Sequence, residues 1–314
     1  MPSSAVSTFT DPGEYAAAFR STSECTITER GQFTAKLTRI DLHRLWMQRY
    51  SDNLPRVAHL ATTKGRAAIT FPTRPGPTQF SAGVEMRPTD IERLPEGISS
   101  FLRSSGSASW GAMTLPIDDM ASVGAAMVGC DLRPPRVSLI VTPPMAAMAK
   151  LQRLHAAAGR LAEDAPEIIA QPEAARGLEQ ALIEALVGCL GEGSADEDRL
   201  AQRRHSLIMR RFRRAVEEDP EQPLYIPELC TAIGVADRTL RVCCQEQLGM
   251  SPKRYLLLRR MNLARGALRD GSPDTTTVTG IAAQYGFWQF GRFAGAYKSL
   301  FGEAPSATLQ RPRE

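Results

Sequence analysis

The chain has 314 residues, of which 43% are hydrophobic and 6% aromatic, so it can bury a full core, and its length indicates two domains. Residues 203–314 carry 18 Lys and Arg against 11 Asp and Glu, a net +7, whereas residues 1–202 carry 20 against 23, a net −3. This imbalance predicts a polyanionic partner for the C-terminal part only. The N-terminus lacks the pattern of a signal peptide, and the apolar runs are too short to span a bilayer, so we expect a cytoplasmic protein without membrane contact.

The six cysteines are scattered, without the CxxC spacing of a zinc or redox motif. We therefore expect reduced and mostly buried thiols, with a redox sensor at the adjacent Cys243 and Cys244 as the alternative. His43 and His59 are too isolated to predict a metal site. The sequence shows no pairing of a nucleophile with a base and no phosphate-binding loop, so we expect neither an enzyme nor a cofactor.

The N-terminal part reads as a short polar start, a possible helix over residues 12–19, and then many short strands. Alternating apolar and polar residues, punctuated by prolines, predict strands within 33–40, 42–47, 56–61, 67–71, 78–83, 91–94, 99–102 and 108–115. Such regular spacing suggests an antiparallel sandwich or barrel. A short helix from 117, a last strand over 137–141 and two amphipathic helices, 144–162 and 172–189, follow. These two helices either pack on their own sheet or pair with a partner subunit.

Residues 191–198, GEGSADED, are small and acidic and read as a linker. The predicted domains are therefore 1–190 and 203–314, with 191–202 as the linker. A basic helix over 204–218 opens the last of these. Its outward arginines are either solvated or in contact with phosphates.

Two similar helix-turn-helix patterns follow this basic helix. Residues 226–248 give a short helix, a turn at Gly234 and a second helix, and residues 278–305 repeat the pattern with a turn at Gly286. Each copy ends in a similar tail, LGMSP and FGEAP. Between them, residues 252–269 predict one helix roughly 27 Å long, which suits two recognition helices about 34 Å apart on one face of DNA.

The second unit and the helix before it resemble the AraC/XylS family of bacterial transcription regulators. The resemblance covers residues 204–311 and is carried by Arg260-Met261, Ala264, Leu268, Val278, Ile281-Ala282, Gly286-Phe287, Arg292-Phe293, Tyr297-Lys298, Phe301-Gly302 and Pro305. It implies an α+β protein with an N-terminal antiparallel, cupin-like sensor domain and a C-terminal all-α domain, in which a linker helix joins two helix-turn-helix units. It further implies promoter DNA, RNA polymerase, a small-molecule effector and a possible second copy as partners of a nucleoid-associated activator. An architectural DNA binder without effector and an N-terminal enzyme fused to a DNA-binding domain are the alternatives.

The sequence departs from the family pattern at three places. Ala236 replaces the usual Ser at the start of the first recognition helix, so capping could pass to Asp237. Cys244 replaces a usual Phe, which predicts a looser core in that unit. Trp288 and Phe290 replace commoner polar residues; they either contact thymine methyl groups or pack on the linker helix.

Candidate DNA-contacting residues follow from these positions. Arginine gives bidentate contacts to guanine. The residues predicted to contact bases are Arg238, Thr239, Arg241, Gln245, Trp288, Gln289 and Arg292, and those predicted to grip phosphates are Lys253, Arg254 and Lys298.

A pocket for a small organic acid requires an arginine and an aromatic wall, which makes Arg39, His43, Trp46 and Trp110 the candidate effector ligands. His59 lies in the same strand-rich region.

Overall fold

The computed structural model describes the chain except for residues 21, 196–199, 219–223 and 312–314. The N-terminal domain is built around strands. Their bounds are β1 (Ser3–Phe9), β2 (Thr22–Ile27), β3 (Ala35–Asp41), β4 (Trp46–Asp52), β5 (Arg56–Ala61), β6 (Arg66–Pro72), β7 (Gln79–Ser81), β8 (Val84–Met86), β9 (Ile91–Leu94), β10 (Ser99–Ser104), β11 (Ala108–Pro116), β12 (Leu139–Thr142) and β13 (Ser194–Ala195).

These strands form two antiparallel sheets. Sheet A has the order β1-β3-β4-β11-β6-β9-β12-β13, and sheet B has the order β2-β5-β10-β7-β8. Each described strand pair is antiparallel, as in β3 and β4, where Ile40 lies opposite Met47. The predicted α+β class, with an antiparallel N-terminal part and a helical C-terminal part, is confirmed.

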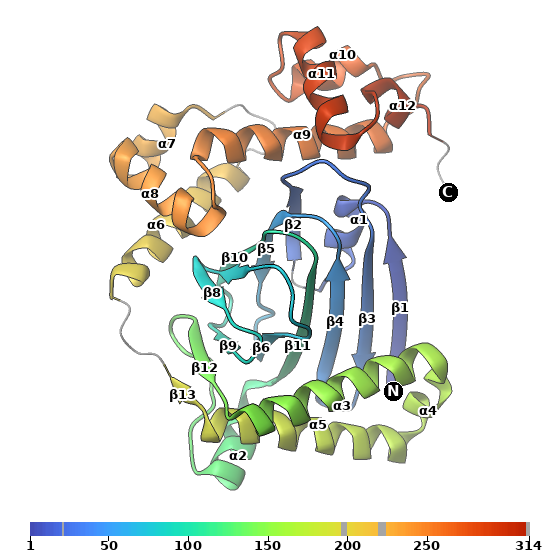
Figure 1. Cartoon of the computed structure of the whole chain (residues 1–314), viewed down its shortest axis with the longest axis vertical. Coiled ribbons are helices and arrows are strands. Elements are labelled where there is room, and N and C mark those ends of the chain that lie inside the picture. Colours follow the sequence, from blue (N-terminus) through green and yellow to red (C-terminus); the bar gives the residue numbers. More distant parts are fainter. Residues whose placement is uncertain (21, 196–199, 219–223, 312–314) are drawn as a thin grey trace.

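The helices of the N-terminal domain are α1 (Pro12–Ala17), α2 (Ile117–Val128), α3 (Met145–Asp164), α4 (Pro166–Ala170) and α5 (Pro172–Glu192). Figure 1 shows α3 and α5 side by side along sheet A. Successive residues of a strand point to opposite faces of the sheet. Accordingly, Leu37 and Trp110 join a core between the two sheets, and Ile40 and Met113 join a second core beneath α3 and α5. The apolar stripes of both helices are thus buried on their own sheet.

Two segments differ from the sequence-based expectation. The predicted polar start is wrong, because residues 3–9 form the edge strand β1, which pairs with β3 from Ser3–Asp41 to Phe9–Ala35. An edge strand with one solvated side shows weak hydrophobic alternation, which hid it in the sequence. In the segment read as a linker, α5 continues to Glu192 and Ser194–Ala195 pair with β12. Residues 196–199 of that segment lie outside the described residues.

The C-terminal domain is all helical, with α6 (Leu200–Glu218), α7 (Ile226–Ile233), α8 (Asp237–Leu248), α9 (Pro252–Asp270), α10 (Val278–Gln284), α11 (Phe290–Phe301) and α12 (Pro305–Leu309). In Figure 1, α9 runs across the end of the sandwich, with α7 and α8 at one end of it and α10 to α12 at the other. Phe212, Leu240 and Leu248 belong to the core of the first unit. Phe293 and Tyr297 belong to the core of the second.

The two domains are joined by an apolar cluster and a polar network. Val57 and Phe101 of sheet B belong to the same buried cluster as Phe212 and Tyr255, and the rings of Phe101 and Tyr255 lie 6.0 Å apart. This shared cluster means that each domain completes the other's core.

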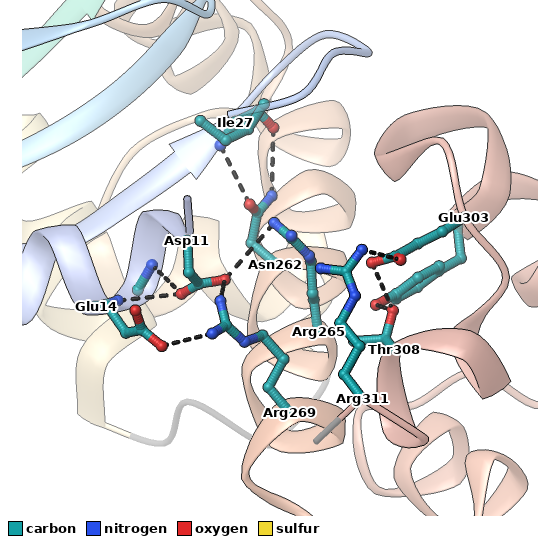
Figure 2. A network of polar contacts seen from close by, with 11 residues as sticks. Asp11, Glu14, Ile27, Asn262, Arg265, Arg269, Glu303, Thr308 and Arg311 are labelled. Carbon is teal, nitrogen blue, oxygen red and sulfur yellow. Dashed lines mark hydrogen bonds and ion pairs between the residues drawn. The ribbon is translucent and has the colours of Figure 1, made fainter. Parts of the chain in front are cut away.

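Figure 2 shows the polar network, in which side chains of α9 reach the N-terminal domain. The Asn262 side chain accepts a hydrogen bond from the Ile27 backbone N–H and donates one to its carbonyl, both at 3.2 Å. The Arg269 guanidinium lies 2.6 Å from the Asp11 carboxylate and pairs with Glu14 at 2.5 Å. A further ion pair, Arg259–Glu24 at 2.9 Å, lies along the same helix. The orientation of α9 is therefore set by contacts with β2 and α1.

Candidate nucleic-acid interface

The first helix-turn-helix unit consists of α7 and α8. Gly234 ends α7 with φ 75°, and its N–H donates to the Cys230 carbonyl at 2.9 Å. A left-handed backbone conformation at this position favours glycine, and it lets the chain turn sharply into α8. Leu240 and Cys244 face the core, so Arg238 at the N-terminal end of α8 is exposed.

The start of α8 differs from the sequence-based expectation. Capping does not pass to Asp237: Ala236 is the N-cap residue, and it makes no side-chain cap hydrogen bond. The Asp237 carboxylate pairs instead with the Arg241 guanidinium at 2.8 Å, one turn along the helix. Its negative charge near the helix N-terminus is still favourable to the helix dipole. The Asp237 carboxylate thus holds the Nε and Nη2 atoms of Arg241, whereas Arg238 has no such partner among the described carboxylates.

The second unit consists of α10 and α11. Gly286 has φ 75°, and the following N–H, that of Phe287, donates to the Ala282 carbonyl at 2.8 Å. The rings of Phe287 and Phe293 lie 4.8 Å apart, as expected for a plug between the two helices. The two units therefore use the same turn chemistry.

The second recognition helix begins later in the chain than the sequence predicted, so the residues expected to contact bases lie partly ahead of it. Trp288 and Gln289 were placed on the helix, but α11 begins at Phe290 with Gln289 as its N-cap residue. The Arg292 guanidinium donates to the Gln289 side-chain oxygen at 2.8 Å. Trp288 is 79% exposed, so it does not pack on α9 as the alternative required, and Phe290 is 43% exposed. Trp288 and Gln289 therefore lie just before α11, and Phe290 is its first residue.

The candidate phosphate ligands flank both units. Lys253 and Arg254 lie in the first turn of α9, and Lys298 lies in the last turn of α11; all three are exposed. The arginines of α6 are more constrained. Arg211 donates to the Ile233 carbonyl at 3.2 Å, and Arg214 pairs with Glu218 at 3.0 Å. These contacts favour a role of α6 in packing and solvation over phosphate binding.

The spacing of the two units is set by α9. Its 19 residues span roughly 28 Å at 1.5 Å per residue. Recognition helices that enter the same face of DNA lie about 34 Å apart. The helix length is compatible with this spacing once the width of the units is added.

The predicted effector ligands lie in different surroundings. Trp110 is 1% exposed in the core between the sheets. Trp46 lies between the guanidinium groups of Arg20 and Arg66, at 4.2 and 3.6 Å from the ring centroid. The two other side chains contact backbone carbonyls: Arg39 that of Ala18 at 3.2 Å, and His43 that of Pro172 at 3.3 Å.

His59 lies at the domain boundary, with its Nδ1 atom 3.6 Å from Glu217. Burial, with a smaller effect of nearby Arg213 and Arg259, lowers the pKa of His59 to about 3. The ring is therefore neutral at pH 7, and its contact with Glu217 is not an ion pair despite the distance. We assign His59 to the packing of the boundary.

A cavity of about 640 Å³, here called the interdomain cavity, lies between sheet B, the segment before β12 and α6. Sequence reasoning missed it. Its lining comes from stretches near residues 81–101, 135–140, 206–213 and 247, and only the tertiary fold brings these together. No local periodicity could have signalled it. The predicted effector ligands are absent from this lining.

The cysteines are buried or partly buried, apart from Cys130, and all six are free. Cys244 Sγ lies 3.9 Å from the Met209 sulfur, and burial raises the pKa of its thiol. A redox sensor requires an accessible thiolate, so this environment opposes that alternative for Cys244. Cys244 and its neighbour Cys243 are both fully buried in the core of the first unit.

Within the described residues, there is no group of three or more His, Cys, Asp or Glu side chains placed to bind a metal ion. A search of the described helices found none with the length and apolar character that crossing a bilayer requires.

Comparison with known proteins places residues 229–311 in a helix-turn-helix domain family. The Probable thc operon regulatory protein of Rhodococcus erythropolis is 41% identical over 95 residues, which is 30% of this chain and 29% of that protein. The XylDLEGF operon transcriptional activator 3 of Pseudomonas putida is 34% identical over 96 residues, 31% of this chain and 29% of that protein. The chain thus spans under a third of the length of these two relatives.

Among solved structures, a probable AraC family transcriptional regulator from Rhodopseudomonas palustris is 34% identical to this chain. The match covers 34% of this chain and 98% of that one, with a TM-score of 0.31.

Proposed function

We propose that the chain is a sequence-specific DNA-binding transcription regulator of the AraC/XylS type, because residues 229–311 match a helix-turn-helix domain family and the relatives from R. erythropolis and P. putida are named as operon regulators. In this proposal α8 and the N-terminal end of α11 enter two successive major grooves. The observation that carries it is the placement of two units with the same turn geometry at opposite ends of α9, each with an exposed arginine at its reading end.

Within the first unit, we assign base contact to Arg238, Thr239, Arg241 and Gln245. Arg238 is the principal reader, since Arg241 is held by Asp237. In the second unit, we assign it to Trp288, Gln289 and Arg292. The hydrogen bond that the Arg292 guanidinium donates to the Gln289 side-chain oxygen pre-orients both groups. Lys253, Arg254 and Lys298 supply the phosphate contacts that fix the register but carry no sequence information.

The test is a selection of binding sites from a random double-stranded DNA pool with the full chain. We expect two half-sites whose centres are about one helical turn apart. Arg238→Ala should relax base preference in one half-site and Arg292→Ala in the other, each at a cost of roughly 1–3 kcal/mol. Arg176→Ala, an exposed arginine on α5, is the matched control.

Two outcomes would contradict the proposal. One is a selected pool without an enriched motif. The other is an enriched motif that is the same for Arg238→Ala, for Arg292→Ala and for the Arg176→Ala control. A uniform loss of affinity without a change in base preference would reassign these arginines to phosphate contact.

We further propose an activator that responds to a small-molecule effector, with domains 1–190 and 203–314 joined by the segment 191–202. The P. putida relative is named a transcriptional activator, which supports activation as the sign of regulation. From the same family resemblance we infer that the protein acts in the cytoplasm, at the nucleoid. Its partners in this proposal are RNA polymerase and a second copy of the chain. A run-off transcription assay with and without the chain on a selected site measures the sign.

A further inference from the structure

Three hydroxyl groups, here called the hydroxyl row, cross the part of sheet A that α3 leaves open. Figure 1 shows α3 across one end of the sheet, with the strands continuing beyond it toward α9. Ser51 of β4 lies opposite Lys36 on β3 and Ser109 on β11, and the Ser109 hydroxyl is 2.7 Å from that of Thr73, the third member. These side chains point to the helix-covered face of the sheet, as that of Met113 does, because residues two apart in a strand share a face.

Two contacts hold α3 beside the hydroxyl row. The Gln152 amide donates to the Pro72 carbonyl at 3.0 Å, at the end of β6. The Glu163 carboxylate pairs with Lys36 of β3 at 2.7 Å. Between these contacts α3 carries Arg160, which is exposed and lines a groove of about 500 Å³ along the helix. The flank of α3 and the hydroxyl row therefore lie side by side.

Arg49 of β4 rises between the row and the helix. Its stem passes α3 at Gly159, where a Cβ atom would lie 3.1 Å from the Arg49 Cδ atom. Its Nη1 atom lies 3.4 Å from Nδ1 of the buried His155. Gly111 in turn leaves room for the His155 ring, because a Cβ atom there would lie 2.8 Å from the ring carbon Cε1. Although glycine weakens a helix or strand interior, these two glycines give one guanidinium group a fixed place.

The guanidinium groups around this place are not neutralised by the chain. Among the described residues, Arg49, Arg74 and Arg160 have no carboxylate partner. Burial and then the charge of Arg74 lower the pKa of Arg49. Arg160 lowers this pKa further, while Glu163, which is itself engaged by Lys36, raises it. Because like charges held together are unfavourable, the cluster is suited to an anion with more than one charge.

We propose that Arg49, Arg74 and Arg160, together with the hydroxyl row, bind a small molecule through a terminal phosphate or diphosphate group. The guanidinium groups of Arg49 and Arg160 donate to the phosphate oxygens from the side of α3, and the Ser51 hydroxyl donates from the sheet. A phosphate group carries a charge of about −1.5 to −2 at pH 7 and three acceptor oxygens. These oxygens match the forked donors of two guanidinium groups and one hydroxyl. A single carboxylate carries less charge and fewer acceptors.

This phosphate site is separate from the parts of the molecule that carry the proposed function. It lies on the N-terminal domain, away from the N-terminal ends of α8 and α11 (Figure 1), and it shares no residue with the interdomain cavity. The inference therefore goes beyond the proposed function and does not depend on it.

The experiment is isothermal titration calorimetry of the full chain at pH 7 and constant ionic strength, without divalent cations. The phosphate probes are inorganic phosphate and pyrophosphate. Malonate tests a dicarboxylate, and hexaglutamate tests an acidic peptide. We expect one phosphate probe to bind per chain, at least about tenfold more tightly than malonate, since phosphate offers more acceptors to the same donors. The tighter of the two phosphate probes identifies the terminal group. Its binding should also raise the temperature of thermal unfolding.

Three variants localise the binding. Arg49→Gln and Arg160→Gln should each weaken it about tenfold or more, since each removes hydrogen bonds between charged groups. Ser51→Ala should weaken it about threefold at unchanged charge, which a merely basic surface would not show. Arg176→Gln is the matched control, because it removes an exposed arginine of α5 that lies outside the site. Thermal unfolding of each variant checks that it folds, and the exposed Arg160 carries the test if Arg49→Gln does not fold.

Any of four results would overturn the assignment. Neither phosphate probe binds; malonate or hexaglutamate binds as tightly as the better phosphate probe; both arginine variants bind as Arg176→Gln does; or Ser51→Ala binds as the unaltered chain does. These readouts need no DNA. A failure here with an intact selected motif removes only the phosphate site, whereas loss of the motif with intact phosphate binding removes only the proposed function.

Discussion

Asp11 performs two tasks with its two oxygens, and substitution can separate them. One oxygen caps α1 by accepting hydrogen bonds from the N–H groups of Gly13 at 2.8 Å and Glu14 at 3.1 Å. The other lies 2.6 Å from Arg269 and 3.7 Å from Arg265 of α9. Asparagine caps a helix about as well as aspartate. Asp11→Asn therefore removes the charge between the domains and keeps the cap, and Asp11→Ala removes both.

The structure gives the magnitude of each effect. A hydrogen bond to a charged group contributes about 1.5–3 kcal/mol. Because the Arg269 side chain is 25% exposed while that of Asp11 is 8% exposed, we discount this to about 1–2 kcal/mol for Asp11→Asn. Loss of the cap adds about 1 kcal/mol in Asp11→Ala.

Native-state hydrogen exchange at the amides of α1 and α9 measures these local opening free energies without requiring two-state unfolding of the whole chain. A double-mutant cycle of Asp11→Asn with Arg269→Gln should give a coupling of about 1–2 kcal/mol. The control cycle uses Arg20 and Asp41, whose side chains are 35% and 28% exposed and whose coupling should be about 0–1 kcal/mol. A coupling at Asp11 no larger than in this surface pair would refute the reasoning.

Three further outcomes are expected. Burial, with a smaller effect of Arg49, lowers the pKa of His155 to about 3 from 6.5. The unfolded state therefore binds more protons between these values, and the free energy of unfolding should fall as the pH drops through that window, by roughly 1 kcal/mol per pH unit. Denaturant titrations at several pH values should show a flatter profile for His155→Gln. Lys253→Ala should weaken DNA binding equally across sequences and reduce the salt slope of the binding constant by about 1; a change in the selected motif would contradict this. Trp288→Ala should change the free energy of unfolding by less than about 0.5 kcal/mol but remove preference for one base in the selected motif.

The sequence predicted the helical part of the fold closely because its signals are local. The helix-turn-helix units were visible from Gly234 and Gly286 and from apolar residues at helical spacing, and both glycines adopt the left-handed conformation that the turns require. Most strands were also placed well, and Arg56–Ala61 and Ile91–Leu94 have the bounds that the alternation predicted. Local composition and periodicity are sufficient for such elements.

The remaining features depend on contacts between distant segments. Alternation alone could not show that Leu37 faces the second sheet while Ile40 faces α3 and α5, since both positions are apolar. The effector candidates were chosen by residue type, but Trp110 fills the core and Trp46 stacks with two arginines. Arg210, which lines the interdomain cavity, was recognised only as one of several basic residues on a helix.

The cluster that Val57 and Phe101 share with α6 and α9 limits how this chain can be divided or recombined. Cleavage of the chain within the acidic segment 191–198 would leave two fragments, each with an exposed apolar surface where it had packed against the other. Such fragments should find each other again when mixed. For the same reason, a chimaera that joins an unrelated N-terminal domain to these helices would need a matching pair of apolar side chains at the new interface. Without them, the apolar residues of α6 and α9 would be exposed to water.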